Sequence, residues 1–114
     1  MHDFRKLRAW QSNRELTVGV YRITATFPSD ERFGLTSQIR RAVVSIGANI
    51  AEGSGRHSDV DKTRFLQMAF ASSTELLHHL ITSVDLEYLN VDDFSKLEDP
   101  LDAVRGQLYA FIKK

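Results

Sequence analysis

The spacing Glu75-Leu76-Leu77-His78 is the feature of this sequence that best matches a metal-binding pattern. Carboxylate di-iron bundles carry Glu-x-x-His on two helices and a further glutamate on each of the other two. A second Glu-x-x-His does not occur in the 114 residues. His78 and His79 are adjacent, so their side chains leave a helix about 100° apart and cannot chelate one ion from the same face. We therefore expect no metal site.

Catalytic and cofactor-binding patterns are also missing. Ser72 and Ser73 lie close to the histidines in sequence, but no turn presents either of them as a strained nucleophile. Gly53-Ser54-Gly55 lacks the strand and the spacing of a phosphate-binding loop. The chain has no cysteine, which excludes disulfides, thiolate metal sites and cysteine nucleophiles. We predict a protein that is not an enzyme and has no cofactor.

Two rows of polar residues have the spacing of one helix face. The first has steps of four, four and three along the chain and borders apolar positions; the second has a comparable helical spacing. The rows consist of Arg41, Ser45, Asn49 and Glu52, and of Ser72, Glu75 and His79. Rows of this kind form either a hydrogen-bonded network that fixes helix register or a subunit interface or ligand surface.

Four amphipathic helices are predicted to carry these residues, over residues 7–25, 36–52, 58–89 and 92–111. Pro28 ends the first helix, and Gly53 is expected to close the second in the left-handed conformation. Ser58 and Asn90 are the candidate N-caps of the third and fourth. Pro100 should kink the fourth helix or restart it with Asp99 as the cap.

Length and composition agree with one globular domain, residues 1–114, in which 42% of residues are hydrophobic and 26% charged. No segment alternates with the two-residue period of a strand. Short connections make consecutive helices antiparallel neighbours. The predicted fold is an all-α, up-down-up-down antiparallel four-helix bundle. No signal peptide or membrane-length apolar run is visible, so we expect a cytoplasmic protein that does not enter a membrane.

The predicted third helix has two neighbouring apolar stripes, a wider apolar face than one bundle subunit requires. The stripes are Leu66, Ala69, Leu76 and Leu80, and Phe70, Leu77, Ile81, Val84 and Tyr88. Either this helix is central in the bundle, or part of its face meets another subunit.

The formal net charge is zero, but the bundle topology separates charges of opposite sign. One end should collect the cations of the N-terminus, the turn around residue 56 and the C-terminus: Arg5, Lys6, Arg8, Arg56, Lys62, Arg64, Lys113 and Lys114, with His2 and His57 nearby. The other end should collect mainly Asp and Glu. This pattern is either a solvated surface that keeps the protein soluble or a surface for anions or nucleic acid.

Four basic residues are the candidates for nucleic-acid binding: Arg40, Arg56, Lys62 and Arg64. The last three lie around one turn and are expected to form a single patch. Arg40 and Arg41 are adjacent, so only one of them can face the bundle. Arg41 is in line with the polar row that contains Ser45, so we expect Arg41 to be structural and Arg40 to be exposed.

Several stretches of the chain closely resemble the four-helix-bundle family of 23S rRNA-intervening sequence proteins. The resemblance begins at Phe27-Pro28, continues through residues 31–35 and 38–42, and is most specific at residues 45–53, SIGANIAEG. Gly55-Arg56, residues 64–66 and Glu75-Leu76 extend it over nearly the whole chain. Many family members have proline at the position of Gly47 and glycine at that of Ala71; a glycine at position 47 should make the second helix more flexible.

The resemblance implies a bundle that assembles into a homo-pentameric ring. A relative, the accessory variability protein of diversity-generating retroelements, resembles a basic pentameric barrel that engages reverse transcriptase and nucleic acid. These implications favour a non-enzymatic, oligomeric accessory protein that binds RNA or DNA. The alternative is a structural scaffold that docks a partner protein without nucleic acid. A steep dependence of binding on salt would separate the two functions.

Overall fold

The computed structural model describes residues 3–113, so the predictions for His2 and Lys114 lie outside the described residues. Four long helices follow one another: α1 (Arg8–Thr24), α2 (Leu35–Ser54), α3 (Asp59–Asp85) and α4 (Val91–Ile112). Two short 3-10 helices, η1 (Phe4–Lys6) and η2 (Ser29–Glu31), precede α1 and α2. No strand occurs between residues 3 and 113. Within the same residues, no helix has the length and apolar character needed to cross a bilayer.

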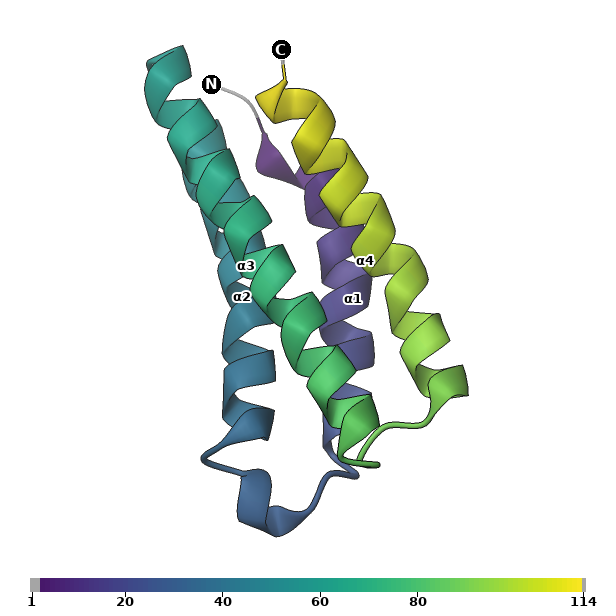
Figure 1. The fold of residues 1–114 in the computed structure, drawn as a ribbon. Helices are drawn as coiled ribbons and strands as arrows, with labels where there is room; N and C mark the ends of the chain where they lie inside the picture. Colours follow the sequence, from purple (N-terminus) through teal and green to yellow (C-terminus); the bar gives the residue numbers. More distant parts are fainter. Residues whose placement is uncertain (1–2, 114) are drawn as a thin grey trace.

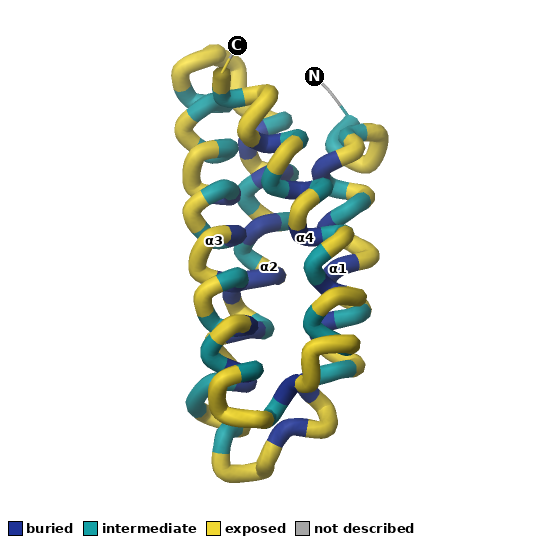
Figure 2. Tube along the Cα trace, turned by 45° about the vertical axis from the view of Figure 1, so that its right-hand side comes forward, coloured by how far each residue is buried: buried dark blue, intermediate teal, exposed yellow. Residues whose placement is uncertain are grey.

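The helices form the predicted up-down-up-down bundle (Figure 1). Each helix packs on two neighbours, α1 on α2 and α4, and α3 on α2 and α4, while the backbones of the diagonal pairs stay more than 8 Å apart, Cα to Cα, among the described residues. The buried positions face the interior between the helices (Figure 2). Leu16, Ile46, Leu76 and Leu101, one from each helix, are fully buried. Burial of each such side chain contributes roughly 1.5–3 kcal/mol, which makes this core the main stabilising element.

The two apolar stripes of α3 are explained largely by its two neighbours. Leu66, Phe70, Leu77 and Val84 pack partly buried against the core, because α3 contacts both α2 and α4. Ile81 is the member of the stripes that remains 47% exposed. Contacts within one chain therefore account for most of the wide apolar face.

Gly53 has a different function from the predicted one. No described glycine has a positive φ, and α2 continues through Gly53 to Ser54. A Cβ at Gly53 would lie 3.0 Å from Cβ of Phe65 and 3.4 Å from the carbonyl oxygen of Lys62. Gly53 thus allows α2 and α3 to approach closely, and it does not end the helix by a left-handed turn.

The left-handed residue of the fold is Glu87, with φ 64°. α3 ends at Asp85, before the predicted residue 89, because the amides of Glu87 and Tyr88 turn back to the carbonyls of Val84 and Ser83. This is the Schellman pattern, in which glycine is the usual left-handed residue. Because this position is occupied by glutamate and not by glycine, the end of the helix could not be recognised from the sequence.

The last helix contains a proline in its interior. α4 is continuous through Pro100, so of the two expected outcomes, a kink or a restart, the restart does not occur. Phe111, near the end of the helix, is 47% exposed. The N-caps follow local chemistry: Ser58 accepts a hydrogen bond from the Asp61 amide at 3.1 Å, and Asn90 accepts one from the Asp93 amide at 2.8 Å.

Candidate nucleic-acid interface

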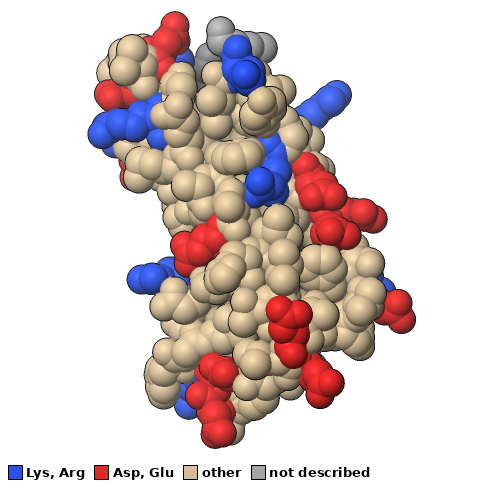
Figure 3. Space-filling view, in the orientation of Figure 1, with Lys and Arg blue, Asp and Glu red and all other residues tan. Residues whose placement is uncertain are grey.

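The topology brings the two chain ends and the α2–α3 turn to one end of the bundle (Figure 1). We call it the basic end. Its described cations are Arg5, Lys6, Arg8, Arg56, Lys62, Arg64 and Lys113. In Figure 3, which has the same orientation, Lys and Arg side chains gather in the upper half of the molecule, whereas acidic side chains predominate in the lower third. The predicted separation of charge is therefore visible on this face.

Arg56 and Arg64 come together around one aromatic ring. The guanidinium carbons of Arg56 and Arg64 lie 4.6 and 5.3 Å from the centre of the Phe65 ring. Arg56 is in the α2–α3 turn and Arg64 in the second turn of α3. Both side chains remain substantially exposed, at 43% and 62%. Two cations thus share one ring, an arrangement that suits contact with adjacent phosphates.

Each of these arginines also has a carboxylate partner. Arg56 pairs with Glu52 at 2.9 Å, and Arg64 pairs with Asp61 at 3.4 Å. Both pairs link residues three or four apart on exposed helix surface. Such pairs are worth roughly 0–1 kcal/mol, so a phosphate can replace the carboxylate at little cost.

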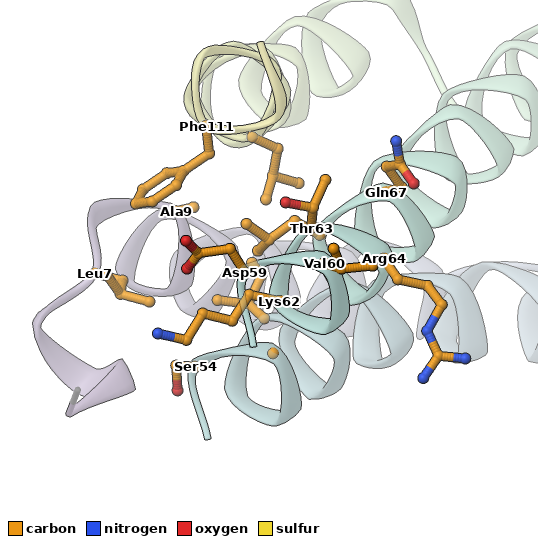
Figure 4. Close-up of a pocket in the computed structure, with 14 residues that line it drawn as sticks. Leu7, Ala9, Ser54, Asp59, Val60, Lys62, Thr63, Arg64, Gln67 and Phe111 are labelled. Carbon is orange, nitrogen blue, oxygen red and sulfur yellow. The ribbon is translucent and has the colours of Figure 1, made fainter. Parts of the chain in front are cut away.

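Lys62 does not join this patch. Residues two apart on a helix point to nearly opposite sides. Figure 4 shows Lys62 reaching across a groove toward Leu7 and Ser54, whereas Arg64 points away from that groove. The predicted set of three therefore divides into an arginine pair on one side and a lysine on the other.

The basic end keeps an excess of unpaired cations. Arg5 donates two hydrogen bonds from its side chain to Asp3, at 2.9 Å each, and these bonds hold the pKa of the Asp3 carboxyl below its usual value. The carboxylates of Asp3, Glu52 and Asp61 are therefore each paired with an arginine. Among the described residues of this end, the cations without an ion pair are Lys6, Arg8, Lys62 and Lys113, while Asp59 is the carboxylate without one.

The structure reverses the expectation for Arg40 and Arg41. Arg40 is half-buried: its side chain donates to Thr24 Oγ1 at 2.9 Å and to the Tyr21 carbonyl at 3.2 Å, and stacks over the Tyr21 ring at 4.6 Å. A cation suits this place because the last carbonyls of α1 carry partial negative charge. Arg41 is exposed and reaches only Gln38. Arg40 therefore clamps α1 to α2, and we remove it from the candidate interface.

The polar rows form several separate contacts. The hydroxyls of Ser45 and Ser72 lie 3.0 Å apart and join α2 to α3, and the Asn49 amide donates to Ser45. Glu75 contacts His79 at 3.1 Å along α3. Arg41 and Glu52 lie outside this network. Between residues 3 and 113, no three His, Cys, Asp or Glu side chains gather in a way that could hold a metal.

Comparison with protein families decides what kind of bundle this is. Residues 5–110 match the model of the 23S rRNA-intervening sequence protein family. The chain belongs to that family. A search of curated proteins gave no match. Among solved structures, the chain is similar to a crystal structure from Bacteroides thetaiotaomicron, described as a protein with unknown function from the S23 ribosomal protein family. The TM-score is 0.83 at 23% identity, over 93% of this chain and 99% of that one, which supports the fold alone.

In this member of the 23S rRNA-intervening sequence protein family, the stretch 45–53 has a packing function at almost every turn. Ser45 contacts Ser72 of α3, and Asn49 donates to Ser45, as described above. A Cβ at Gly47 would lie 2.9 Å from Asn13 Nδ2, which donates to the Val43 carbonyl at 3.1 Å. Gly47 therefore makes room for a buried contact between α1 and α2, where the sequence had suggested only flexibility.

Sequence reasoning missed two residues that fix the helices. Asn13 is 97% buried on the inner face of α1, at a position that the apolar periodicity did not include. Arg105 of α4 donates to Ser73 Oγ at 3.2 Å and Thr74 Oγ1 at 2.8 Å, and stacks over the Phe70 ring at 4.6 Å. Arg105 is not one of the cations of the basic end. No pattern in the residues around it indicated that it joins α3 to α4.

Proposed function

We propose that the chain is a non-catalytic accessory protein that binds RNA through its basic end and acts in the cytoplasm. The observation that carries the proposal is the pair Arg56 and Arg64, whose guanidinium groups both lie over the Phe65 ring, at the end of the bundle that has further cations without an ion pair. Phosphate contacts of this kind supply affinity without reading the base sequence. We therefore expect binding that differs little between RNA sequences.

A phosphate would take over the positions of the two carboxylates. Arg56 and Arg64 would exchange Glu52 and Asp61 for phosphate oxygens, and each exchange forms a charge-assisted hydrogen bond. The Phe65 ring limits the freedom of both guanidinium groups, so less side-chain entropy is lost when the phosphate binds. Lys6 and Arg8, which have no ion pair, would raise the local concentration of the nucleic acid.

We propose further that the functional unit is a homo-oligomeric ring, the pentamer that the family resemblance implied. Val44, Met68 and Ile81 are large apolar side chains on α2 and α3 that each remain nearly half exposed, and a subunit contact would cover such positions. Parallel subunits in a ring would repeat the basic end on one rim. Multi-angle light scattering at micromolar concentration should give a multiple of 13.0 kDa, and a monomer mass would remove this part of the proposal.

Salt dependence is the test of RNA binding. Fluorescence anisotropy with labelled single-stranded RNAs of unrelated sequence, over a series of KCl concentrations, should give a linear fall of log affinity with log salt. Each phosphate contact on a single strand contributes a slope of about 0.7. The double variant Arg56→Ala, Arg64→Ala should therefore lower the slope by about 1.4 and weaken binding to all the RNAs alike.

A matched control removes two arginines from the opposite end. Arg22 is exposed in the last turn of α1, and Arg32 lies over the Phe33 ring at 5.9 Å, much as Arg56 lies over Phe65. Arg22→Ala, Arg32→Ala makes the same change of charge and should leave the slope unchanged. Equal effects of the two double variants would contradict a localised interface. Absence of salt-dependent binding by the wild type would favour the alternative function, a scaffold that docks a protein partner.

A further inference from the structure

The basic end also contains an open groove of about 960 Å³, which Arg64 borders although its guanidinium group points away from it (Figure 4). Its walls come from all four helices and the residue before α1. The apolar walls are formed by Leu7, Ala9, Ile50, Leu66, Leu108 and Phe111. Polar side chains, among them Thr63 and Gln67, stand along one edge. The volume is within the range of sites for small molecules, which are mostly apolar with a few polar groups.

Charged groups lie at the mouth of this groove. Lys62 reaches across the mouth toward Leu7 and Ser54, and it has no ion pair in the described chain (Figure 4). Arg64 is the second cation of the lining, and its guanidinium group, which is paired with Asp61, points away from the groove. Asp59 is the one carboxylate in the lining. The groove therefore combines apolar walls with a mouth at which Lys62 is the unpaired cation.

We propose that this groove binds a long-chain carboxylate, with the hydrocarbon chain against the apolar walls and the carboxylate beside Lys62. An apolar chain suits the aliphatic lining, and a single anionic head group suits Lys62, the cation of the lining that has no ion pair in the described chain. Each methylene that the groove buries should strengthen binding about fourfold. Affinity should therefore rise steeply from octanoate to laurate and oleate until the groove is filled.

The first experiment measures binding of oleate below its micelle concentration by isothermal titration calorimetry, with the folded wild-type chain. Trp10, the single tryptophan, follows Ala9 and packs edge-to-face on Phe4 at 5.1 Å, so its fluorescence is a second reporter beside the groove. We expect one saturable site per chain. The corresponding fatty alcohol should bind at least about tenfold more weakly, because it cannot make a charge-assisted bond with Lys62.

Two charge changes at the mouth should act in opposite directions. Lys62→Glu should weaken oleate binding by at least about tenfold, because it replaces a charge-assisted contact by repulsion. Asp59→Asn should strengthen it, because the carboxylate in the lining repels the head group. Lys96→Glu is the matched control: Lys96 is 75% exposed near the other end of α4 and lies outside this groove. This control should leave oleate affinity unchanged.

A third variant tests the apolar walls without altering charge. Thr63→Trp should fill the groove and abolish oleate binding, provided that circular dichroism shows the wild-type helix content. Val60→Trp serves the same purpose if Thr63→Trp does not fold, since Val60 lines the groove yet is 80% exposed. The RNA interface is separable: Arg56→Ala should retain wild-type oleate affinity, because Arg56 lies outside the groove lining.

Several results would overturn the proposal. One is the absence of saturable binding below the micelle concentration. Another is an unchanged affinity in the folded groove variant. Binding to phosphatidylglycerol vesicles without binding of free oleate would assign the surface to a membrane. A wild-type oligomer that ignores oleate and dissociates when Thr63 is replaced by Trp would show that a second copy of the chain covers the groove.

Discussion

Gly47 lies against Asn13, and we expect Gly47→Ala to destabilise the protein when Asn13 is present and to stabilise it when residue 13 is alanine. The Asn13 amide nitrogen donates to the Val43 carbonyl at 3.1 Å across the α1–α2 interface, and the side chain is only 3% exposed. The Asn13 carbonyl oxygen has no hydrogen-bond partner among the described residues. A Cβ on residue 47 would stand 2.9 Å from that amide nitrogen. Gly47→Ala must therefore displace Asn13 or shift the two helices apart.

Two opposing free energies determine the result. Replacing glycine by alanine inside a helix stabilises it by about 1 kcal/mol. Displacing Asn13 leaves a buried donor without a partner, which costs roughly 1–3 kcal/mol. Gly47→Ala should therefore lower the free energy of unfolding by up to about 2 kcal/mol. In the Asn13→Ala background no amide is displaced, so the same change should raise it by about 1 kcal/mol.

A double-mutant cycle measures this coupling directly. Urea unfolding of the wild type, both single variants and the double variant is followed by circular dichroism at one fixed protein concentration, because self-association would shift the midpoint. The expected coupling energy is about 1–3 kcal/mol. Gly106→Ala is the control: it is exposed in α4 with no atom within 4 Å of the added Cβ, so it should be stabilising in every background.

Equal stabilisation of the protein by Gly47→Ala with and without Asn13 would refute the predicted coupling. That outcome would mean that the helices accommodate the methyl group freely. A destabilisation of the same size in both backgrounds would also refute it, because the clash would then involve another group.

Two further predictions concern the α3–α4 turn. Glu87→Gly should raise the free energy of unfolding by about 1 kcal/mol, and Tm by about 4 °C, because glycine adopts the left-handed conformation without strain. Glu87→Ala should have little effect. If thermal unfolding showed the same change in Tm for both variants, backbone strain at residue 87 would not be the cause. The Tyr88 hydroxyl donates to Glu31 Oε2 at 3.1 Å, and this bond raises the pKa of Tyr88 above its usual value of 10.0. Folding therefore favours the neutral hydroxyl of Tyr88. The hydrogen bond stabilises the protein fully below pH 10.0, and this stabilisation is lost as the pH rises through the pKa of Tyr88 in the folded state. Tyr88→Phe should flatten the dependence of the urea midpoint on alkaline pH, and parallel profiles for the variant and the wild type would contradict this.

Local sequence signals determined the helices and their order. The apolar period, Pro28 and the N-caps Ser58 and Asn90 depend on residues close in the chain, so they could be recognised without the fold. The short connections then left an antiparallel bundle as the natural topology. The separation of cations and carboxylates between the two ends follows from that topology alone.

Only the tertiary structure decided what each face meets. Arg40 and Arg41 are adjacent and both border the apolar face, and the neighbouring end of α1 determined that Arg40 is the clamp. Lys62 and Arg64 lie in the same turn of α3, but their side chains point in different directions. Lys62 reaches across the groove, whereas Arg64 lies over the Phe65 ring. Gly47 and Gly53 are explained by side chains of α1 and α3 that approach them across helix contacts. Periodicity fixes which residues share a face, but the partner of that face depends on residues far away in the chain.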